Sequence, residues 1–253
     1  MKTVFRFILV ALLSLSPKIF SQETNKPEPI ETDRPDQTET PTIIPKGTFQ
    51  METGFSYEKA NEDESSTLSP TVLFKYGVNG NFELRLITEY TTNKFGDDKI
   101  SGLNPVLVGF KVKLAEEKGI LPKTSFLGHL LIPDLASKEL RADYYATEFR
   151  FSMQHTLSDK VNLSYNLGAE WDGVSPEATF AYTMSLGIEL TNKMNTFLEV
   201  YGFAPQNDKA DHRFDTGLTY LISDNFMIDA SGGFGMTENA PDYFASAGFS
   251  FRL

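Results

Sequence analysis

The last eleven residues of the chain, 243–253 (YFASAGFSFRL), alternate between two kinds of side chain. Counting back from Leu253, every second residue is uncharged and apolar or aromatic, whereas the intervening positions are mostly small or polar. This period of two is the period of a β-strand. A terminal strand with so much apolar surface is typical of a transmembrane β-barrel, whose last strand pairs with its first and faces lipid. A buried edge strand of a soluble β-sandwich is the alternative.

Composition excludes several classes of protein. The chain of 253 residues contains no cysteine, which excludes disulfides, zinc–thiolate sites and thiol nucleophiles. Its formal net charge of −11 argues against a nucleic-acid partner, which would bind a basic patch. The hydrophobic fraction of 40% is low for a helical membrane protein but suits a transmembrane barrel, in which only every second strand residue meets lipid.

Residues 1–21 have the pattern of a secretory signal peptide. Lys2 and Arg6 supply the positive start, and residues 7–15 (FILVALLSL) form an apolar core that is too short to span a bilayer as a helix. Ser21 offers a small residue for cleavage before Gln22. We therefore expect the chain to be exported across the inner membrane.

Residues 22–46 form a proline-rich segment without a clear helix or strand period. One interpretation is a disordered periplasmic tail. The other is an ordered segment that enters the barrel, because residues 31–41 (ETDRPDQTETP) are dense in hydrogen-bonding groups, as a lumen plug would need to be. The candidate plug residues are Asp33, Arg34, Pro35 and Asp36.

Residues 47–253 divide by alternation into twelve strands. The predicted strands are 48–58, 68–76, 82–92, 104–114, 124–132, 145–157, 161–171, 178–190, 196–203, 212–221, 226–234 and 243–253. Short turns alternate with mostly longer loops, among them 93–101 and 133–143, and aromatic residues gather near both ends of the outward rows, as membrane interfaces favour. The expected fold is all-β: a transmembrane antiparallel β-barrel of about 12 strands, with short periplasmic turns and longer outer loops.

Three stretches also carry a family resemblance. The run 32–41 (TDRPDQTETP), the following Pro45-Lys46-Gly47 and the strand 49–55 (FQMETGF) resemble the start of the putative MetA-pathway of phenol degradation proteins. The similarity covers about residue 31 to the C-terminus. It implies an outer-membrane barrel, often labelled a transporter, in a Gram-negative bacterium, and it supplies no catalytic residues. The terminal strand resembles the signal that the barrel-assembly machinery binds.

Function is expected inside the barrel. The inward rows carry somewhat more acids than bases, and a barrel of this size lies between the small filled ones and the wide porins. We expect a narrow, partly plugged lumen through which small solutes, aromatic or hydrophobic compounds among them, diffuse passively. Alternatively, most of these charges only pair across strands and fill the barrel. The residues expected to line the solute path are Glu52, Glu83, Arg85, Glu89, Lys111, Glu148, Arg150, Glu170, Glu199, Arg213 and Asp215.

A lipid-modifying enzyme of the outer membrane is the rival hypothesis. That chemistry needs a nucleophile, a base and an orienting group within hydrogen-bond reach. His155 lies near a predicted periplasmic turn, and His129 lies in a predicted strand whose two faces are both apolar. His212 lies at the outer rim, with no obvious outward serine on either neighbouring strand. We therefore expect no catalytic residues, metal or cofactor. A structural barrel without transport would need larger outer loops. The expected partners are outer-membrane lipid, the barrel-assembly machinery and a small solute.

Overall fold

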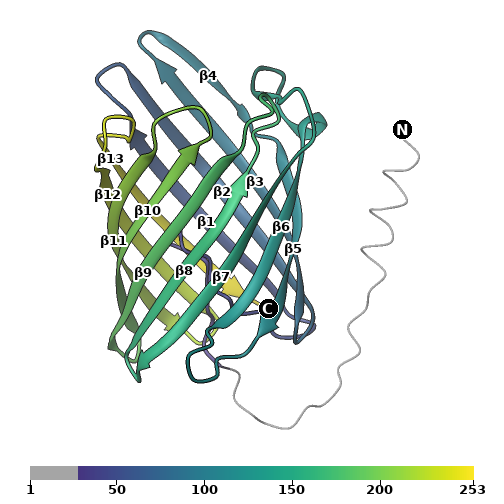
Figure 1. The fold of residues 1–253 in the computed structure, drawn as a ribbon, viewed down its shortest axis with the longest axis vertical. Coiled ribbons are helices and arrows are strands. Elements are labelled where there is room, and N and C mark those ends of the chain that lie inside the picture. Colours follow the sequence, from purple (N-terminus) through teal and green to yellow (C-terminus); the bar gives the residue numbers. More distant parts are fainter. Residues whose placement is uncertain (1–27) are drawn as a thin grey trace, which may run out of the picture.

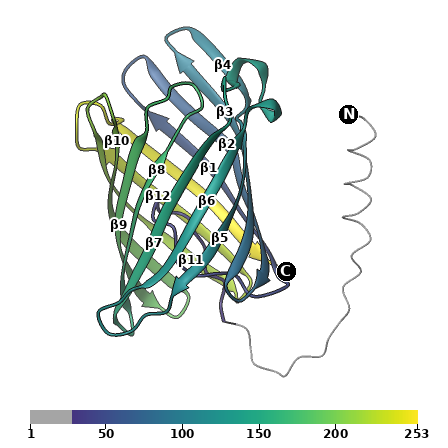
Figure 2. The same cartoon turned by 45° about the vertical axis from the view of Figure 1, so that its right-hand side comes forward.

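A computed structural model of the protein describes residues 28–253, and the predicted signal peptide lies outside these residues. The described chain forms a closed antiparallel β-barrel with tilted strands (Figures 1 and 2). The barrel closes because β1 (Phe49–Lys59) pairs with β2 (Glu64–Asn79) on one side and with β13 (Tyr243–Arg252) on the other. No helix among the described residues is long and apolar enough to cross a membrane.

Strands pair with their neighbours in sequence, except that β4 and β5 both pair with β3, so the barrel is a simple meander. Two short 3₁₀ helices, η1 (Pro133–Leu135) and η2 (Lys138–Leu140), lie in the longest loop. The remaining strands are β3 (Phe82–Phe95), β4 (Asp98–Leu103), β5 (Val106–Ala115), β6 (Lys123–Ile132), β7 (Ala146–Ser158), β8 (Val161–Glu170), β9 (Thr179–Thr191), β10 (Met194–Pro205), β11 (Asp211–Ser223) and β12 (Phe226–Gly235).

The predicted loop 93–101 is wrong, because β3 continues through it and turns back into β4. β4 and β5 pair in succession with β3 and are separated only by Asn104-Pro105, so they form one barrel strand with an interruption. Proline has no N–H to donate to the ladder, which explains a break at this point. Because β4 and β5 count as one, the thirteen described strands make the expected twelve strands around the barrel. The outer hairpin was missed because its residues, such as Lys94 and Lys99, show no apolar alternation.

The two ends of the barrel differ in their connections. Two-residue turns follow β2, β7, β9 and β11 at one end, whereas most connections at the other end are longer. The C-terminus lies at the short-turn end (Figure 1). In outer-membrane barrels the short turns face the periplasm and the long loops face outward. The predicted alternation of turns and loops is therefore present.

Most apolar side chains of the strands face outward, and most polar side chains face inward. Met184, Leu198 and Leu218 are each about half exposed on the outer surface, whereas inward residues such as Glu83 and Lys111 are completely buried. A soluble protein has the reverse distribution. The outer surface is therefore a lipid-facing band, and the chain spans a membrane with its strands.

Met184→Arg on this band is expected to destabilise the barrel by about 2–4 kcal/mol, because the side chain lies near the middle of β9 and would place a charge in hydrocarbon. Ile120→Arg is the matched control, since Ile120 is 90% exposed in the connection between β5 and β6 at the short-turn end. Urea titration in lipid vesicles, followed by heat-modifiable mobility on gels, measures both variants. Equal stabilities would refute the assignment of the outward face of β9.

Candidate functional site: the lumen segment and its walls

Residues 30–44 precede β1 in the sequence and are called the lumen segment below. They lie inside the barrel (Figure 2). At one end the Ile30 N–H donates to the Asp224 carbonyl in the turn between β11 and β12 (2.8 Å). At the other end the Ile44 N–H donates to Glu83 Oε2 (3.0 Å). The chain then enters β1 through a turn at Gly47, whose φ of 77° suits glycine. The lumen segment is therefore held at both ends.

One side of the lumen carries three cations, Lys75 on β2, Arg85 on β3 and Lys111 on β5, which we call the basic wall. They come together because Lys75 and Arg85 are paired in register, while Lys111 is paired with Glu83 next along β3. All three are at least 97% buried. Such burial is tolerated only when the charges are paired.

Two carboxylates of the lumen segment pair with this basic wall. Asp33 contacts Arg85 Nη1 and Lys111 Nζ, both at 3.0 Å, and also Lys75 Nζ. Glu39 contacts Arg85 Nη2 at 2.7 Å and Lys111 Nζ at 3.1 Å. Burial alone would raise the pKa of Asp33, but the three cations outweigh it and hold that pKa well below its usual range. Asp33 is therefore ionised in the docked segment.

The barrel supplies two acids of its own among these cations. Glu52 pairs with Lys75 (2.5 Å), and Glu83 pairs with Arg85 (3.1 Å). Both also accept backbone hydrogen bonds from the lumen segment, Glu52 from the Asp33 N–H at 2.9 Å and Glu83 from Ile44. The basic wall is therefore partly neutralised by the barrel itself, and it binds the segment through backbone as well as side-chain groups.

The far side of the lumen carries Glu199 on β10, Asp215 on β11 and Asp229 on β12, which we call the acidic wall. Arg34 reaches it and pairs with Asp229 (Nη2 to Oδ1, 2.8 Å). Glu199 accepts from the Gln37 N–H (2.8 Å) and the Thr38 hydroxyl (2.5 Å). Strand order places β11 five steps from β3 in one direction and seven in the other, counting β4 and β5 as one strand. The two walls therefore face each other across the lumen.

Residues 36–39, the tip of the lumen segment, also contact β7, β8 and β9, which lie between the walls. Ser185 on β9 donates to Asp36 (2.9 Å), Thr38 bonds Thr183 (2.7 Å), and Asn166 on β8 accepts from the Glu39 N–H (2.7 Å). Ser152 on β7 donates to the Glu39 carbonyl. Burial, and next the nearby Glu199, raise the pKa of Asp36 well above its usual range. The tip is thus fastened across β7–β10 near mid-depth.

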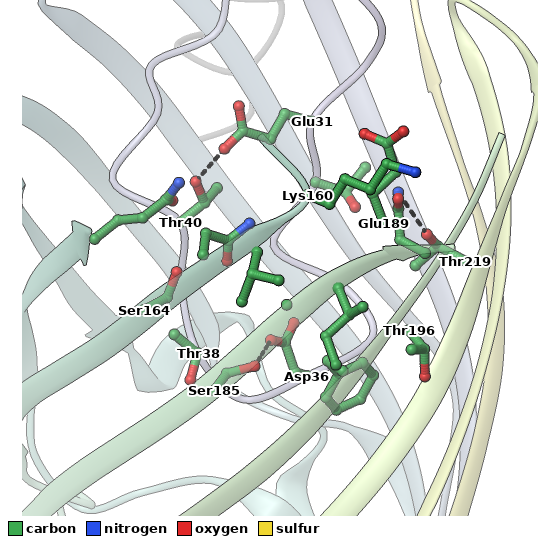
Figure 3. Close-up of a pocket in the computed structure, with 18 of the residues that line it drawn as sticks. Glu31, Asp36, Thr38, Thr40, Lys160, Ser164, Ser185, Glu189, Thr196 and Thr219 are labelled. Atoms are coloured by element: carbon green, nitrogen blue, oxygen red, sulfur yellow. Dashed lines mark hydrogen bonds between the residues drawn. The ribbon is translucent and has the colours of Figure 1, made fainter. Parts of the chain in front are cut away.

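Two cavities lie on either side of this tip. The inner cavity, of about 430 Å³, lies towards the short-turn end and is lined by hydroxyls of Thr38, Ser164, Ser185, Thr196 and Thr219 among other groups (Figure 3). The outer cavity, of about 530 Å³, lies towards the long loops and is lined by acids together with apolar and aromatic surface: Glu148, Glu170, Trp171, Leu107 and Leu131. The lumen segment therefore stands between two hollow parts of the barrel.

The residues predicted to line the path fall into two groups. Six are buried in the walls around the lumen segment: Glu52, Glu83, Arg85, Lys111, Glu199 and Asp215. The other five lie nearer the long-loop end and are partly exposed: Glu89, Glu148, Arg150, Glu170 and Arg213. Among these five, Arg150 reaches the segment, at the Gln37 carbonyl (3.3 Å). Of the plug candidates, Asp33, Arg34 and Asp36 make the polar contacts described above, and Pro35 lines the inner cavity.

The residues expected to line the path did not include several that hold the lumen segment, chief among them Lys75, Glu39 and Asp229, although Lys75 and Asp229 lie in the predicted inward rows. An inward lysine opposite an inward arginine in the next strand is a signal that could have found Lys75. Glu39 belongs to the same polar run as Asp36, and the composition of that run is its only signal. The neutral contacts, such as Asn166, have no comparable signal, because Asn, Ser and Thr occur throughout the inward rows.

The histidines are all hydrogen-bonded to groups other than a nucleophile. His129 accepts from Arg85 Nε (3.1 Å) and bonds Glu148 (2.7 Å). His155 bonds the Tyr165 hydroxyl (3.3 Å), and His212 bonds the Tyr182 hydroxyl (2.8 Å). Within residues 28–253 no histidine ring bonds a serine or threonine hydroxyl, and no group of three or more His, Asp or Glu residues is placed to hold a metal ion.

The family model described as "Putative MetA-pathway of phenol degradation" matches residues 32–253. The chain belongs to this family. The resemblance noted in the sequence is thereby confirmed, and the match begins inside the lumen segment, one residue before Asp33. No curated protein matches the chain.

Solved structures share the fold of this family member at low sequence identity. An outer membrane channel from Pseudomonas putida F1 superimposes with a TM-score of 0.67 at 10% identity, over 84% of this chain and 97% of that one. The NanC porin gives 0.54 at 11% identity, over 81% and 100%. The translocator domain of the autotransporter NalP from Neisseria meningitidis gives 0.51 at 10% identity, over 83% and 90%. These likenesses show an outer-membrane barrel fold, which serves more than one function.

Proposed function

We propose that this protein is a passive channel for small solutes in the outer membrane, and that the lumen segment restricts what passes. The observation that supports this most is the position of the tip, residues 36–39, between the inner and the outer cavity. Two of the similar barrels are described as a channel and a porin. Export through the signal peptide and insertion by the barrel-assembly machinery through β13 belong to the same proposal.

The outer cavity suggests which small solutes enter. Trp171, Leu107 and Leu131 offer apolar and aromatic surface, and Glu148 and Glu170 offer hydrogen-bond acceptors. Such a mixture suits a compact molecule with an aromatic ring and a polar group. We propose aromatic compounds as one class of solute, in agreement with the family description, which refers to phenol degradation.

An enzymatic role receives less support, because the histidine rings bond Arg85, Glu148, Tyr165 and Tyr182 and not a nucleophile. We propose that the protein catalyses no reaction. Solute flux and catalysis can both be measured on the same purified sample.

Purified protein in proteoliposomes is expected to pass small solutes such as phenol and glycerol, to exclude oligosaccharides, and to leave the phospholipid intact. Flux is measured by liposome swelling and lipid products by mass spectrometry, with protein-free liposomes as the control. Lipid hydrolysis without solute flux would contradict the proposal and favour an outer-membrane enzyme.

A further inference from the structure

Two adjacent residues of the lumen segment bind the two opposite walls. The carboxylate of Asp33 contacts all three cations of the basic wall, and the guanidinium of Arg34 pairs with Asp229 of the acidic wall. Arg34 also donates to Ser246 Oγ on β13 (3.0 Å). The Asp33-Arg34 pair therefore lies across the lumen as a dipolar ligand would, with its negative group on one side and its positive group on the other.

The acidic wall is short of positive charge even with the segment docked. Asp215 is 1% exposed, and its Oδ1 has no hydrogen-bond partner. Glu199 receives only an N–H and a hydroxyl from the lumen segment, and among residues 28–253 no lysine or arginine pairs with Glu199 or Asp215. A buried carboxyl group without a cationic partner is costly to ionise. A cation entering this side of the lumen would therefore be stabilised.

The walls keep opposite charges when the segment is absent. The basic wall retains three cations against Glu52 and Glu83, a surplus of +1 (3 − 2), whereas the acidic wall retains three carboxyl groups, and among the described residues of the barrel no lysine or arginine pairs with them. Opposed charges in a narrow lumen with low-dielectric walls produce a strong transverse field. A molecule that carries both charges can satisfy both walls at once, whereas one that carries a single charge leaves the other wall unpaired.

We propose that the space between the two walls is a binding site for small zwitterionic solutes. The carboxylate of the solute takes the place of the Asp33 side chain beside Lys75, Arg85 and Lys111. Its amino or guanidino group takes the place of Arg34 beside Asp229. This inference deepens the proposed function, since it names a solute class for the channel, and it rests on the withdrawal of the lumen segment to admit the solute.

The first test uses a full-length variant in which residues 32–39 are replaced by glycine and serine, so that the walls are intact and free of the segment's charges. Three probes share one ring: 4-(aminomethyl)benzoate is a zwitterion, benzoate an anion and benzylamine a cation. We expect the zwitterion to bind about tenfold tighter or more than either singly charged probe, measured by calorimetry in detergent micelles. Similar affinities for all three probes, or no binding, would overturn the inference.

Wall substitutions in the same variant are matched controls. Lys111→Gln is expected to weaken binding of the zwitterion and of benzoate, and to leave binding of benzylamine unchanged. Asp229→Asn is expected to weaken binding of the zwitterion and of benzylamine, and to leave binding of benzoate unchanged. Heat-modifiable mobility shows that each variant is folded. A uniform loss of all probes with either substitution would overturn the assignment of the two ends.

The second test uses the unaltered chain and needs no engineered lumen. Hydrogen exchange at the amides of Asp33, Gln37 and Glu39, which bond Glu52, Glu199 and Asn166, reports the docking of the segment. Millimolar 4-(aminomethyl)benzoate is expected to speed this exchange by displacing the segment, while benzoate and benzylamine leave it unchanged. Equal exchange with all three probes would overturn the inference. Failure of solute flux in proteoliposomes, with zwitterion binding retained, would instead refute the proposed function.

Discussion

Deleting residues 22–41 is expected to leave a folded barrel that conducts several-fold more current than the full-length chain. The barrel ladder does not depend on these residues, because β1 closes on β2 and β13 through its own pairings. Lys75 and Arg85 keep partners in Glu52 and Glu83, and water can enter to solvate Lys111, which loses Asp33 and Glu39. What disappears is the tip between the two cavities, so that ions gain a continuous aqueous path.

Single-channel recording in planar bilayers measures this effect. The matched control removes only residues 22–27 and keeps every contact of the lumen segment described above. It is expected to conduct like the full-length chain. If the longer deletion also conducts like the full-length chain, the lumen segment does not obstruct the channel and the proposed restriction is refuted.

Two isosteric substitutions in the lumen segment are expected to act in opposite directions. Asp33→Asn removes the charge that three buried cations hold, and should weaken docking of the segment by about 3–5 kcal/mol. Asp36→Asn removes a carboxyl that burial and Glu199 disfavour in its charged form, and keeps an oxygen that accepts from Ser185. It should therefore tighten docking at neutral pH.

The fraction of time spent at low conductance, together with exchange of the Gln37 amide, measures docking in both variants. The pH dependence gives a further check on Asp36. Its pKa is raised in the docked state, so its contribution to docking is present below the ordinary value of about 3.9 and is lost as pH rises through the raised pKa. The full-length chain should therefore open more readily at neutral than at mildly acidic pH, and this trend should shrink in Asp36→Asn. A stronger trend in the variant would be inconsistent with this assignment.

The contribution of Asp33 to docking has the opposite pH dependence. Its pKa is lowered in the docked state, so its contribution is present above the ordinary value and is lost as pH falls through the lowered pKa. The two aspartates together place the tightest docking at mildly acidic pH. Loosening at still lower pH should disappear in Asp33→Asn, which lacks that carboxyl.

The barrel could be predicted from the sequence because lipid imposes a period of two on most of the strands, although β6 is apolar on both faces. Residues 180, 184 and 186 of β9 are apolar because they face hydrocarbon, so β9 could be predicted from its alternation alone. Alternation does not predict the part of the chain that extends beyond the membrane. There the hairpin of β3 and β4 is stabilised by its ladder and by pairs such as Thr92 with Ser101 (2.9 Å), and no apolar row marks it.

The lumen contacts could be predicted only in part. Periodicity shows that Arg85, Lys111 and Glu199 point inward, but it does not show which inward residues meet. Asp33 and Lys111 are 78 positions apart, and they touch because the barrel closes and the segment folds back into it. Their pairing depends on barrel diameter, strand stagger and the turn at Gly47, which are properties of the whole chain. The polar composition of residues 31–41 indicated a plug without indicating its partners.

The turn at Gly47 joins the lumen segment covalently to β1, and this attachment makes the segment an intramolecular ligand of its own binding site. A short tether holds such a ligand at an effective concentration in the millimolar range, however dilute the protein is. A free solute must compete against that local concentration. Under the proposed zwitterion binding, traces of such a solute would leave the segment docked, whereas a millimolar supply would displace it, so the attachment sets the concentration at which a zwitterion competes with the segment.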